Sequence, residues 1–207
     1  MKQNKTNKKF VYLISPDKID NKNFYTNLAL VLRSGKVSFF QLRLKKETNL
    51  NKLIIGTKIK KICKKYKVKF LINDDPLLAK KLNADGCHLG QKDMDLIKAR
   101  KILKNKIIGI TCHNSINLAK RAIEDGANYL AFGAFYSTKT KIVKYKASLA
   151  ILKSVKKITS LPIVAIGGIK LSNYKKLLLN KANFLAISSY IWTNKKYKPL
   201  EAIKKLK

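Results

Sequence analysis

The sequence predicts an α/β fold, a single (β/α)8 TIM barrel that takes in residues 1–207 as one domain. Short apolar runs alternate strictly with amphipathic stretches of period near 3.6, and no low-complexity block or linker divides them. This alternation implies parallel strands with right-handed crossovers, and eight such units close most simply into a barrel. An open doubly wound sheet is the alternative. It normally shows a glycine-rich fingerprint after its first strand, and Ser15-Pro16-Asp17-Lys18 has none.

The expected strands are short runs of β-branched, aromatic and other apolar residues with turn residues between them. In chain order they are Phe10–Ser15, Ser38–Arg43, Val68–Ile72, Gly86–Leu89, Ile107–Thr111, Tyr129–Gly133, Ile163–Ile166 and Phe184–Ile187.

The expected helices repeat their apolar residues with helical spacing. In chain order they are Phe24–Arg33, Leu50–Tyr66, Pro76–Leu82, Leu96–Leu103, Ser115–Asp125, Ser148–Ile158, Asn173–Leu179 and Leu200–Leu206. Capping signals support three of them. Asp75 precedes a proline at the first helical position, Ser115 or the asparagine before it can cap the fifth helix, and Ser172 can cap the seventh.

The charge balance is extreme, with 46 Lys+Arg against 11 Asp+Glu and a formal net charge of +35. A strongly basic chain suggests a nucleic-acid partner. However, only four of the 46 basic residues are arginine, the residue that suits forked contacts with phosphates and bases, and the lysines are spread from end to end. We therefore interpret the charge mainly as a compositional bias and expect no specific nucleic-acid partner.

The cysteines and the N-terminus indicate where the protein works. Cys63, Cys87 and Cys112 stand singly and are odd in number, which argues against a disulfide framework. No apolar run approaches the roughly 18 residues of a membrane span. The basic segment 1–9, expected to be flexible, lacks the apolar stretch of a secretory signal. We expect a cytoplasmic protein with no membrane partner, and the sequence leaves open whether it forms a homo-oligomer.

Acidic residues are scarce but clustered. Five of the eleven, Asp74, Asp75, Asp85, Asp93 and Asp95, fall within one short stretch. In a barrel the chemistry sits at the carboxyl ends of the strands, and Asp74 and Asp93 follow neighbouring expected strands. Two carboxylates with substrate phosphates and water suit Mg²⁺, so the sequence predicts a magnesium site there.

Other polar residues also gather at expected strand ends. Gln41, Arg43 and Lys45 alternate with leucines and therefore point to one side, which favours an anion. The hydroxyl- and lysine-rich loop from Ser137 to Lys141 suits a phosphate. So do the paired glycines Gly167 and Gly168 together with Ile187 and Ser188, because the seventh and eighth strands form a recurrent phosphate site in barrels.

The two histidines receive different interpretations. His88 is expected to be packed and hydrogen-bonded rather than a metal ligand, because nothing near it completes a nitrogen and sulfur site. His113 either faces the pocket as a titrating group or is satisfied by a neighbour. The positions suggest no Ser–His–Asp or Cys–His nucleophile.

Together the strand ends resemble those of the thiamine phosphate synthase family over nearly the whole chain. The motifs are Gln41-x-Arg43-x-Lys45, Asn73-Asp74, Asp85-Gly86-x-His88-x-Gly90-Gln91-x-Asp93, Gly109-x-Thr111-x-His113, Thr138-x-Thr140-Lys141, Ala165-Ile166-Gly167-Gly168-Ile169 and Ile187-Ser188. The resemblance implies a (β/α)8 barrel that joins 4-amino-5-hydroxymethyl-2-methylpyrimidine diphosphate to 4-methyl-5-(2-phosphoethyl)thiazole. The products are thiamine phosphate and diphosphate, and the path is dissociative and assisted by Mg²⁺.

The resemblance also implies a role for each matching residue. Asp74 and Asp93 would bind Mg²⁺; Arg43, Lys45, Asn73 and Lys141 would contact the diphosphate; Gln41 would contact the pyrimidine; Thr138 and Thr140 would line the thiazole end; Gly168, Ile187 and Ser188 would hold the thiazole phosphate. Thr111 stands where many members have serine and keeps the hydroxyl of a substrate-binding position.

Two other functions remain as alternatives. A thiazole tautomerase of the same barrel family shares a histidine at the position of His113, but that relative lacks the Gly-Gln-x-Asp element and the Thr-x-Thr-Lys loop present here. A basic nucleic-acid-binding protein built on a degenerate barrel would bind DNA or RNA in a salt-sensitive manner and show no turnover.

Overall fold

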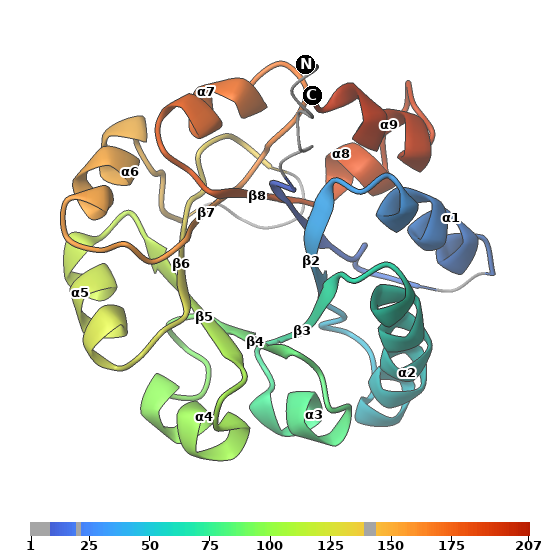
Figure 1. The fold of residues 1–207 in the computed structure, drawn as a ribbon, viewed down its shortest axis with the longest axis horizontal. Helices are drawn as coiled ribbons and strands as arrows, with labels where there is room; N and C mark the ends of the chain where they lie inside the picture. The colour runs from blue at the N-terminus through green and yellow to red at the C-terminus, as the bar shows by residue number, and fades with distance from the viewer. Residues whose placement is uncertain (1–8, 20–21, 139–143) are drawn as a thin grey trace, which may run out of the picture.

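The computed structural model describes residues 9–19, 22–138 and 144–207. Its eight parallel strands form a closed barrel in which each strand pairs with the next along the chain and β8 pairs with β1 (Figure 1). The predicted (β/α)8 barrel is thus confirmed, and the open sheet is excluded. The strands are β1 Val11–Ile14, β2 Val37–Leu42, β3 Lys69–Asn73, β4 Gly86–Leu89, β5 Ile107–His113, β6 Tyr129–Phe132, β7 Ile163–Ile166 and β8 Phe184–Ile187.

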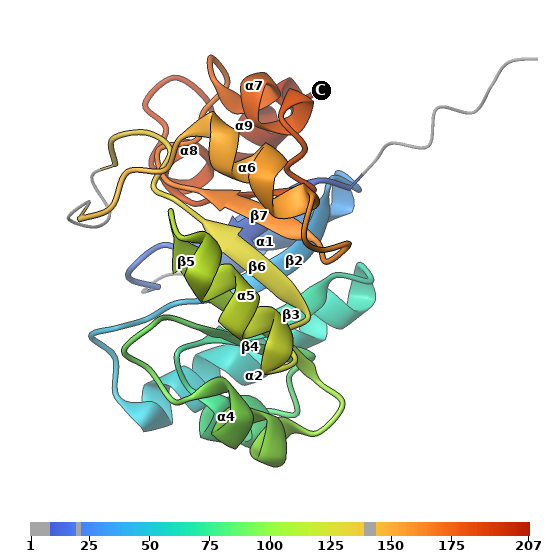
Figure 2. The ribbon, with the colours of Figure 1, turned by 90° about the vertical axis from the view of Figure 1, so that its left-hand side faces the viewer.

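The helices surround the barrel, as seen along its axis in Figure 1 and from the side in Figure 2. They are α1 Lys22–Arg33, α2 Asn49–Lys65, α3 Pro76–Lys81, α4 Leu96–Leu103, α5 Ile116–Glu124, α6 Leu149–Lys156, α7 Tyr174–Leu179, α8 Ser189–Trp192 and α9 Pro199–Lys205. The last helix lies beside α1, which brings the end of the chain back to its beginning. None of the helices among the described residues is long and apolar enough to cross a membrane.

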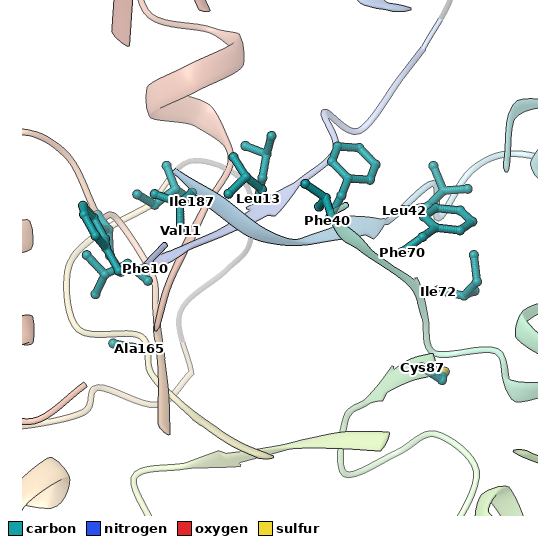
Figure 3. Packing of buried hydrophobic residues seen from close by; sticks show 14 of the residues in the cluster. Phe10, Val11, Leu13, Phe40, Leu42, Phe70, Ile72, Cys87, Ala165 and Ile187 are labelled. Atoms are coloured by element: carbon teal, nitrogen blue, oxygen red, sulfur yellow. The ribbon is translucent and has the colours of Figure 1, made fainter. Parts of the chain in front are cut away.

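Strand alternation divides the core into two layers, because successive side chains of a strand point to opposite faces. The outer layer lies between the strands and the helices, where Figure 3 shows Val11, Leu13, Phe40 and Phe70 on the helix side of the sheet. The inner layer fills the barrel itself. It contains Tyr12, Ile14, Leu71, Tyr129, Ala131, Val164 and Ala186.

Two of the predicted helix caps are confirmed. The Asp75 carboxylate accepts a hydrogen bond from the backbone N–H of Leu78, and the Ser115 hydroxyl accepts one from Leu118. The predicted cap Ser172 is wrong, because the helix begins one residue later, after Asn173. The Asn173 side chain is engaged elsewhere, where it accepts from the Lys170 N–H at 2.8 Å and donates to a loop carbonyl.

The short helix α8 has no counterpart among the expected elements. A single turn shows no helical period in the sequence, so its residues read as part of the loop that follows β8. It starts directly after Ser188, and the indole N–H of Trp192 donates to the Ile14 carbonyl at 2.6 Å. This bond ties the end of α8 to the end of β1.

Candidate active site

The parallel strands place all of their carboxyl ends at one mouth of the barrel, where barrel enzymes carry their chemistry. The predicted acidic pair meets there. Asp74 follows β3 and Asp93 lies in the loop after β4, where burial and the neighbouring Asp74 carboxylate both raise the pKa of Asp93. Lys45, beyond the end of β2, places its Nζ 3.1 Å from Oδ2 of Asp74. The structure thus brings these three residues together at the mouth.

The backbone fixes both carboxylates in place. Asp74 has a φ of 65°, an uncommon conformation for a residue other than glycine, and its N–H donates to the His88 carbonyl at 2.8 Å. Oδ2 of Asp93 accepts a bond of 2.6 Å from the Gly90 N–H. Burial raises the pKa of Asp93, and the neighbouring Asp74 raises it further, while the Gly90 bond and Lys45 lower it.

These carboxylates fit a magnesium ion that is only partly enclosed by protein. Among the described residues no group of three or more His, Cys, Asp or Glu side chains could hold a metal. Mg²⁺ characteristically takes one or two carboxylates, several waters and substrate phosphate oxygens rather than an all-protein cage. Two adjoining carboxylates beside a lysine suit such an ion and leave room for a phosphorylated ligand. A cavity of about 210 Å³ is lined by Asp74, Lys45 and Lys52 of α2.

Arg43 forms an ion pair with an acidic residue of the neighbouring loop. Its Nη1 lies 2.5 Å from Oδ1 of Asp17, in the loop after β1. The Ser15 hydroxyl holds the backbone of Arg43 by accepting from its N–H at 2.9 Å and donating to its carbonyl at 3.2 Å. Gln41, Arg43 and Lys45 thus lie along one edge of the mouth, but each side chain contacts a different partner. Sequence reasoning missed Asp17, although its place after the first strand is a signal.

Gln41 and Asn73 form an amide pair inside the mouth. Nε2 of Gln41 donates to Oδ1 of Asn73 at 2.9 Å, and Gln41 is only 2% exposed. The pairing of β2 with β3 brings them together, because each stands near the end of its strand. Two amides that share one hydrogen bond keep a carbonyl oxygen on Gln41 and an NH₂ group on Asn73 for a ligand.

His88 is the buried, hydrogen-bonded histidine that the sequence predicts. Its Nδ1 lies 2.8 Å from the Tyr129 hydroxyl, and its Nε2 lies 2.9 Å from Oγ1 of Thr111. The Tyr129 hydroxyl in turn lies 2.8 Å from that of Tyr12. Sequence reasoning missed both tyrosines as polar groups, because in their strands they read as apolar residues. The Gln91 side chain donates to the Thr111 carbonyl at 2.6 Å.

The opposite side of the mouth is built from the ends of β7 and β8. Gly167 and Gly168 have φ of 105° and 59°, and a Cβ on Gly168 would lie 2.3 Å from the Ser137 carbonyl oxygen. Position 168 therefore needs glycine, because its φ is positive and there is no room for a Cβ. Ile187 is buried in the outer layer, so only its backbone can face a ligand. The Ser188 hydroxyl donates to the Ser15 carbonyl at 3.1 Å.

The loop after β6 is described in part. Thr138 lies within the described residues, whereas Thr140 and Lys141 lie outside them. Beyond the gap, the Tyr145 ring stacks on the His113 imidazole with ring centroids 4.2 Å apart. The Tyr145 ring thus packs on one face of the His113 imidazole. His113 and Tyr145 also line a second cavity, of about 410 Å³.

A closed (β/α)8 barrel with its polar side chains gathered at the strand ends belongs to the class of TIM-barrel enzymes. The model of the family described as thiamine monophosphate synthase matches residues 11–191. The chain belongs to this family, and it is a transferase of thiamine biosynthesis that acts on small molecules.

Two curated relatives and one solved structure illustrate the similarity. Thiamine-phosphate synthase of Pelagibacter ubique is 87% identical over 207 residues, which is 100% of both chains. Thiamine-phosphate synthase of Nitrosomonas eutropha is 38% identical over 184 residues, 88% of this chain and 86% of the other. The structure of thiamine phosphate pyrophosphorylase from Pyrococcus furiosus superposes with a TM-score of 0.82 at 26% identity, covering 97% of this chain and 94% of that one.

Proposed function

We propose that the chain condenses 4-amino-5-hydroxymethyl-2-methylpyrimidine diphosphate with 4-methyl-5-(2-phosphoethyl)thiazole in a Mg²⁺-assisted dissociative substitution. The observation that carries the proposal is the convergence of Asp74, Asp93 and Lys45 beside the Gln41–Asn73 amide pair. A carboxylate pair next to a lysine suits a metal-bound diphosphate, and the amide pair suits a polar heterocycle attached to it. The buried free cysteines also support a cytoplasmic location.

Asp74 and Asp93 would hold the Mg²⁺ ion. The ion, when bound, would stabilise the negative charge that develops on the departing diphosphate. Lys45 lies against Asp74, and it would turn from this carboxylate to the diphosphate when substrate binds. Arg43 must make a similar exchange, from Asp17 to a phosphate oxygen. The two ion pairs hold both cations at the site.

The amide pair would orient the pyrimidine. Because the Gln41 NH₂ group donates to Asn73, the Gln41 carbonyl oxygen would accept from the 4-amino group of the pyrimidine. The Asn73 NH₂ group would donate to a diphosphate oxygen. The buried position of Gln41 keeps water from competing for this contact. The pyrimidine methylene would thereby be fixed with its leaving group directed toward the cations.

The far side of the mouth would position the thiazole. Backbone N–H groups at Gly168, Ile187 and Ser188 would bind its phosphate, and Thr138 and Thr140 would line its ring. In the reaction the bond between the methylene carbon and the diphosphate oxygen breaks, and diphosphate keeps the electron pair. The thiazole nitrogen then donates its lone pair to the carbocation. Lys141 would add a third cation toward the diphosphate, and fixed charges of this kind lower the barrier.

The test is a two-substrate assay on the purified chain. We expect thiamine phosphate and diphosphate to form with Mg²⁺ and product formation to stop with EDTA. Asp93→Asn should lower turnover by about 10²-fold or more, the scale of removing one preorganised charge-stabilising group. Asp95→Asn, the same change two residues on at a helix cap, is the matched control and should keep its activity. No product at any pH or with any divalent metal would overturn the proposal.

The diphosphate contact of Lys141 has its own test. Lys141→Met should lower kcat with the metal still required, whereas Lys139→Met in the same loop should not. Equal rates for the two variants would contradict the role of Lys141.

A further inference from the structure

A row of hydrogen-bonded side chains runs through the inside of the barrel below the mouth, and only its last member, Thr111, is predicted from the sequence to bind substrate. The row joins the hydroxyls of Tyr12 and Tyr129 at 2.8 Å, Tyr129 and Nδ1 of His88 at 2.8 Å, and Nε2 of His88 and Oγ1 of Thr111 at 2.9 Å. Its four residues come from β1, β6, β4 and β5. The barrel therefore brings together groups that are as far as 117 positions apart in the chain.

The packing leaves this row little freedom. Both tyrosines belong to the inner layer, at 2% and 3% exposure, and the Tyr129 ring stacks on the His88 imidazole with an interplanar angle of 15°. A Cβ at Gly109 would lie 1.8 Å from Cζ of Tyr129, so only glycine leaves room for this ring. Gly109 and Thr111 share one face of β5. The Gly109-x-Thr111 motif thus has a physical reason. Gly109 leaves room for the Tyr129 ring, which hydrogen-bonds to His88, and His88 in turn hydrogen-bonds to Thr111.

The direction of the hydrogen bonds follows from counting donors. Burial raises the pKa of Tyr12 and of Tyr129, so both phenols keep their protons. Among the described residues the Tyr12 hydroxyl bonds only to that of Tyr129. If Tyr129 donated to Tyr12, the Tyr12 proton would be a buried donor without an acceptor, which is costly.

In the opposite direction, every hydroxyl and imidazole proton from Tyr12 to His88 has an acceptor within the row. Tyr12 donates to Tyr129, and Tyr129 donates to Nδ1 of His88. Because Nδ1 then accepts, the neutral imidazole carries its proton on Nε2 and donates it to Thr111.

We propose that this row fixes His88 as the Nε2–H tautomer and thereby makes Thr111 a hydrogen-bond donor to the substrate. With its oxygen accepting from His88, the Thr111 hydroxyl hydrogen points away from the histidine to an acceptor atom of the bound pyrimidine diphosphate. Thr111 contacts substrate, whereas Tyr12, Tyr129 and His88 are positioning residues. The identity of the ligand rests on the proposed function, but the direction of the row does not.

The direction can be measured without any substrate. The chain has two histidines, so ¹⁵N-histidine labelling gives two imidazole spin systems, and a His113→Asn variant identifies that of His88. We expect the His88 spectrum to show a protonated Nε2 and an unprotonated Nδ1. A protonated Nδ1, in either the other tautomer or an imidazolium, would overturn the proposal. This measurement uses the unaltered row, so it does not depend on whether a variant folds.

The consequence for the ligand is tested by calorimetric titration of pyrimidine diphosphate in the presence of Mg²⁺. Thr111→Ser keeps the donor and is the reference for the valine variant. Thr111→Val keeps the volume but loses the donor, and it should bind about tenfold to a hundredfold more weakly, the scale of one hydrogen bond to a charged acceptor. Equal affinity of the serine and valine variants would overturn the donor role.

A tyrosine variant tests the positioning role with a matched control. Tyr129→Phe should weaken binding about threefold to tenfold, because one neutral hydrogen bond in the row is lost. Tyr66→Phe, at the C-terminal end of α2, should bind as the parent does. Unchanged affinity in Tyr129→Phe would overturn the role of the row. Loss of all binding by the parent chain would instead refute the proposed function, while the tautomer measurement would still stand.

Discussion

At the residue scale, the arrangement of Asp74 and Asp93 is energetically unfavourable. The Asp74 and Asp93 carboxylates lie close together, and one of them has a backbone conformation that few residues other than glycine adopt. Burial and the like charge both oppose ionisation of Asp93, which raises its pKa. Such local cost is common where a protein keeps groups ready for a ligand. Here the ligand that would relieve it is a cation.

Replacing Asp93 should therefore stabilise the metal-free chain while it removes activity. Because the pKa of Asp93 is raised on folding, the folded state binds the proton more tightly than the unfolded state. This carboxylate thus destabilises the fold progressively as pH rises through the raised pKa. Asp93→Asn should raise the free energy of unfolding by about 0.5 kcal/mol at neutral pH, the scale of a partly exposed charge interaction.

Urea unfolding in EDTA at several pH values measures this effect. The gain should shrink as pH falls toward the unfolded pKa of an aspartate, about 3.9, because Asp93 of the parent chain is then protonated as well. Asp95→Asn should show no comparable gain, since asparagine caps a helix as well as aspartate does. A gain of the same size at every pH would show that charge is not its cause.

At the element scale, the loops after β6 and β7 are interlocked. Gly168 packs against the Tyr136–Ser137 backbone, and its own carbonyl accepts from the Asn173 side chain at 3.0 Å. The Tyr136 N–H donates to the Gly167 carbonyl at 3.2 Å. The proposed phosphate end of the site thus depends on one loop supporting another.

Gly168→Ala should damage this arrangement in two ways. It places a Cβ 2.3 Å from the Ser137 carbonyl oxygen, and it imposes a positive φ on a residue with a side chain. Gly126→Ala is the matched control, because Gly126 has a φ of 86° but open space around its Cβ position. The control should lose about 1 kcal/mol of stability from backbone strain alone.

Gly168→Ala should lose more stability than Gly126→Ala, and it should also raise the KM for the thiazole phosphate. Chemical unfolding and steady-state kinetics of the two variants measure the difference. Equal losses with an unchanged KM would mean that the contact between the loops does not shape the site.

The elements themselves were predictable from local patterns. The expected strand Ser38–Arg43 and the observed β2 Val37–Leu42 differ by one residue at each end, because apolar periodicity is a property of neighbouring residues. The partners of polar groups were not predictable in the same way. Arg43 pairs with Asp17, and Tyr12 with Tyr129, only because the closed barrel makes their strands adjacent or opposite. The proximity of Asp74 and Asp93 could be predicted from the sequence, because they follow consecutive strands.

At the scale of the whole molecule, closure of the barrel buries all three cysteines. Burial raises the pKa of Cys112 to about 12 and raises that of Cys63 and Cys87 further. At pH 8 almost no reactive thiolate is present in the folded chain. A thiol reagent should therefore label none of the three in the native protein and all of them in denaturant. Labelling of one cysteine under native conditions would reveal local opening of the layer that contains it.

The net charge of +35 is also a property of the whole molecule. Only a few cations stand at the mouth, but the summed field of the lysines attracts both anionic substrates of the proposed reaction. Added salt screens this field, with a Debye length of about 10 Å at 0.1 M and about 3 Å at 1 M. Raising KCl from about 50 mM to about 500 mM should therefore lower kcat/KM several-fold, while kcat, measured at saturating substrate, changes little.

Steady-state kinetics over a salt series measure both quantities. Replacing several lysines on the outer helices with glutamine, away from the mouth, should flatten the dependence on salt without changing kcat. This result would assign the charge a role in substrate capture. A salt dependence that stays the same in such a variant would place the effect entirely in the few cations at the mouth, Lys45 and Arg43 among them.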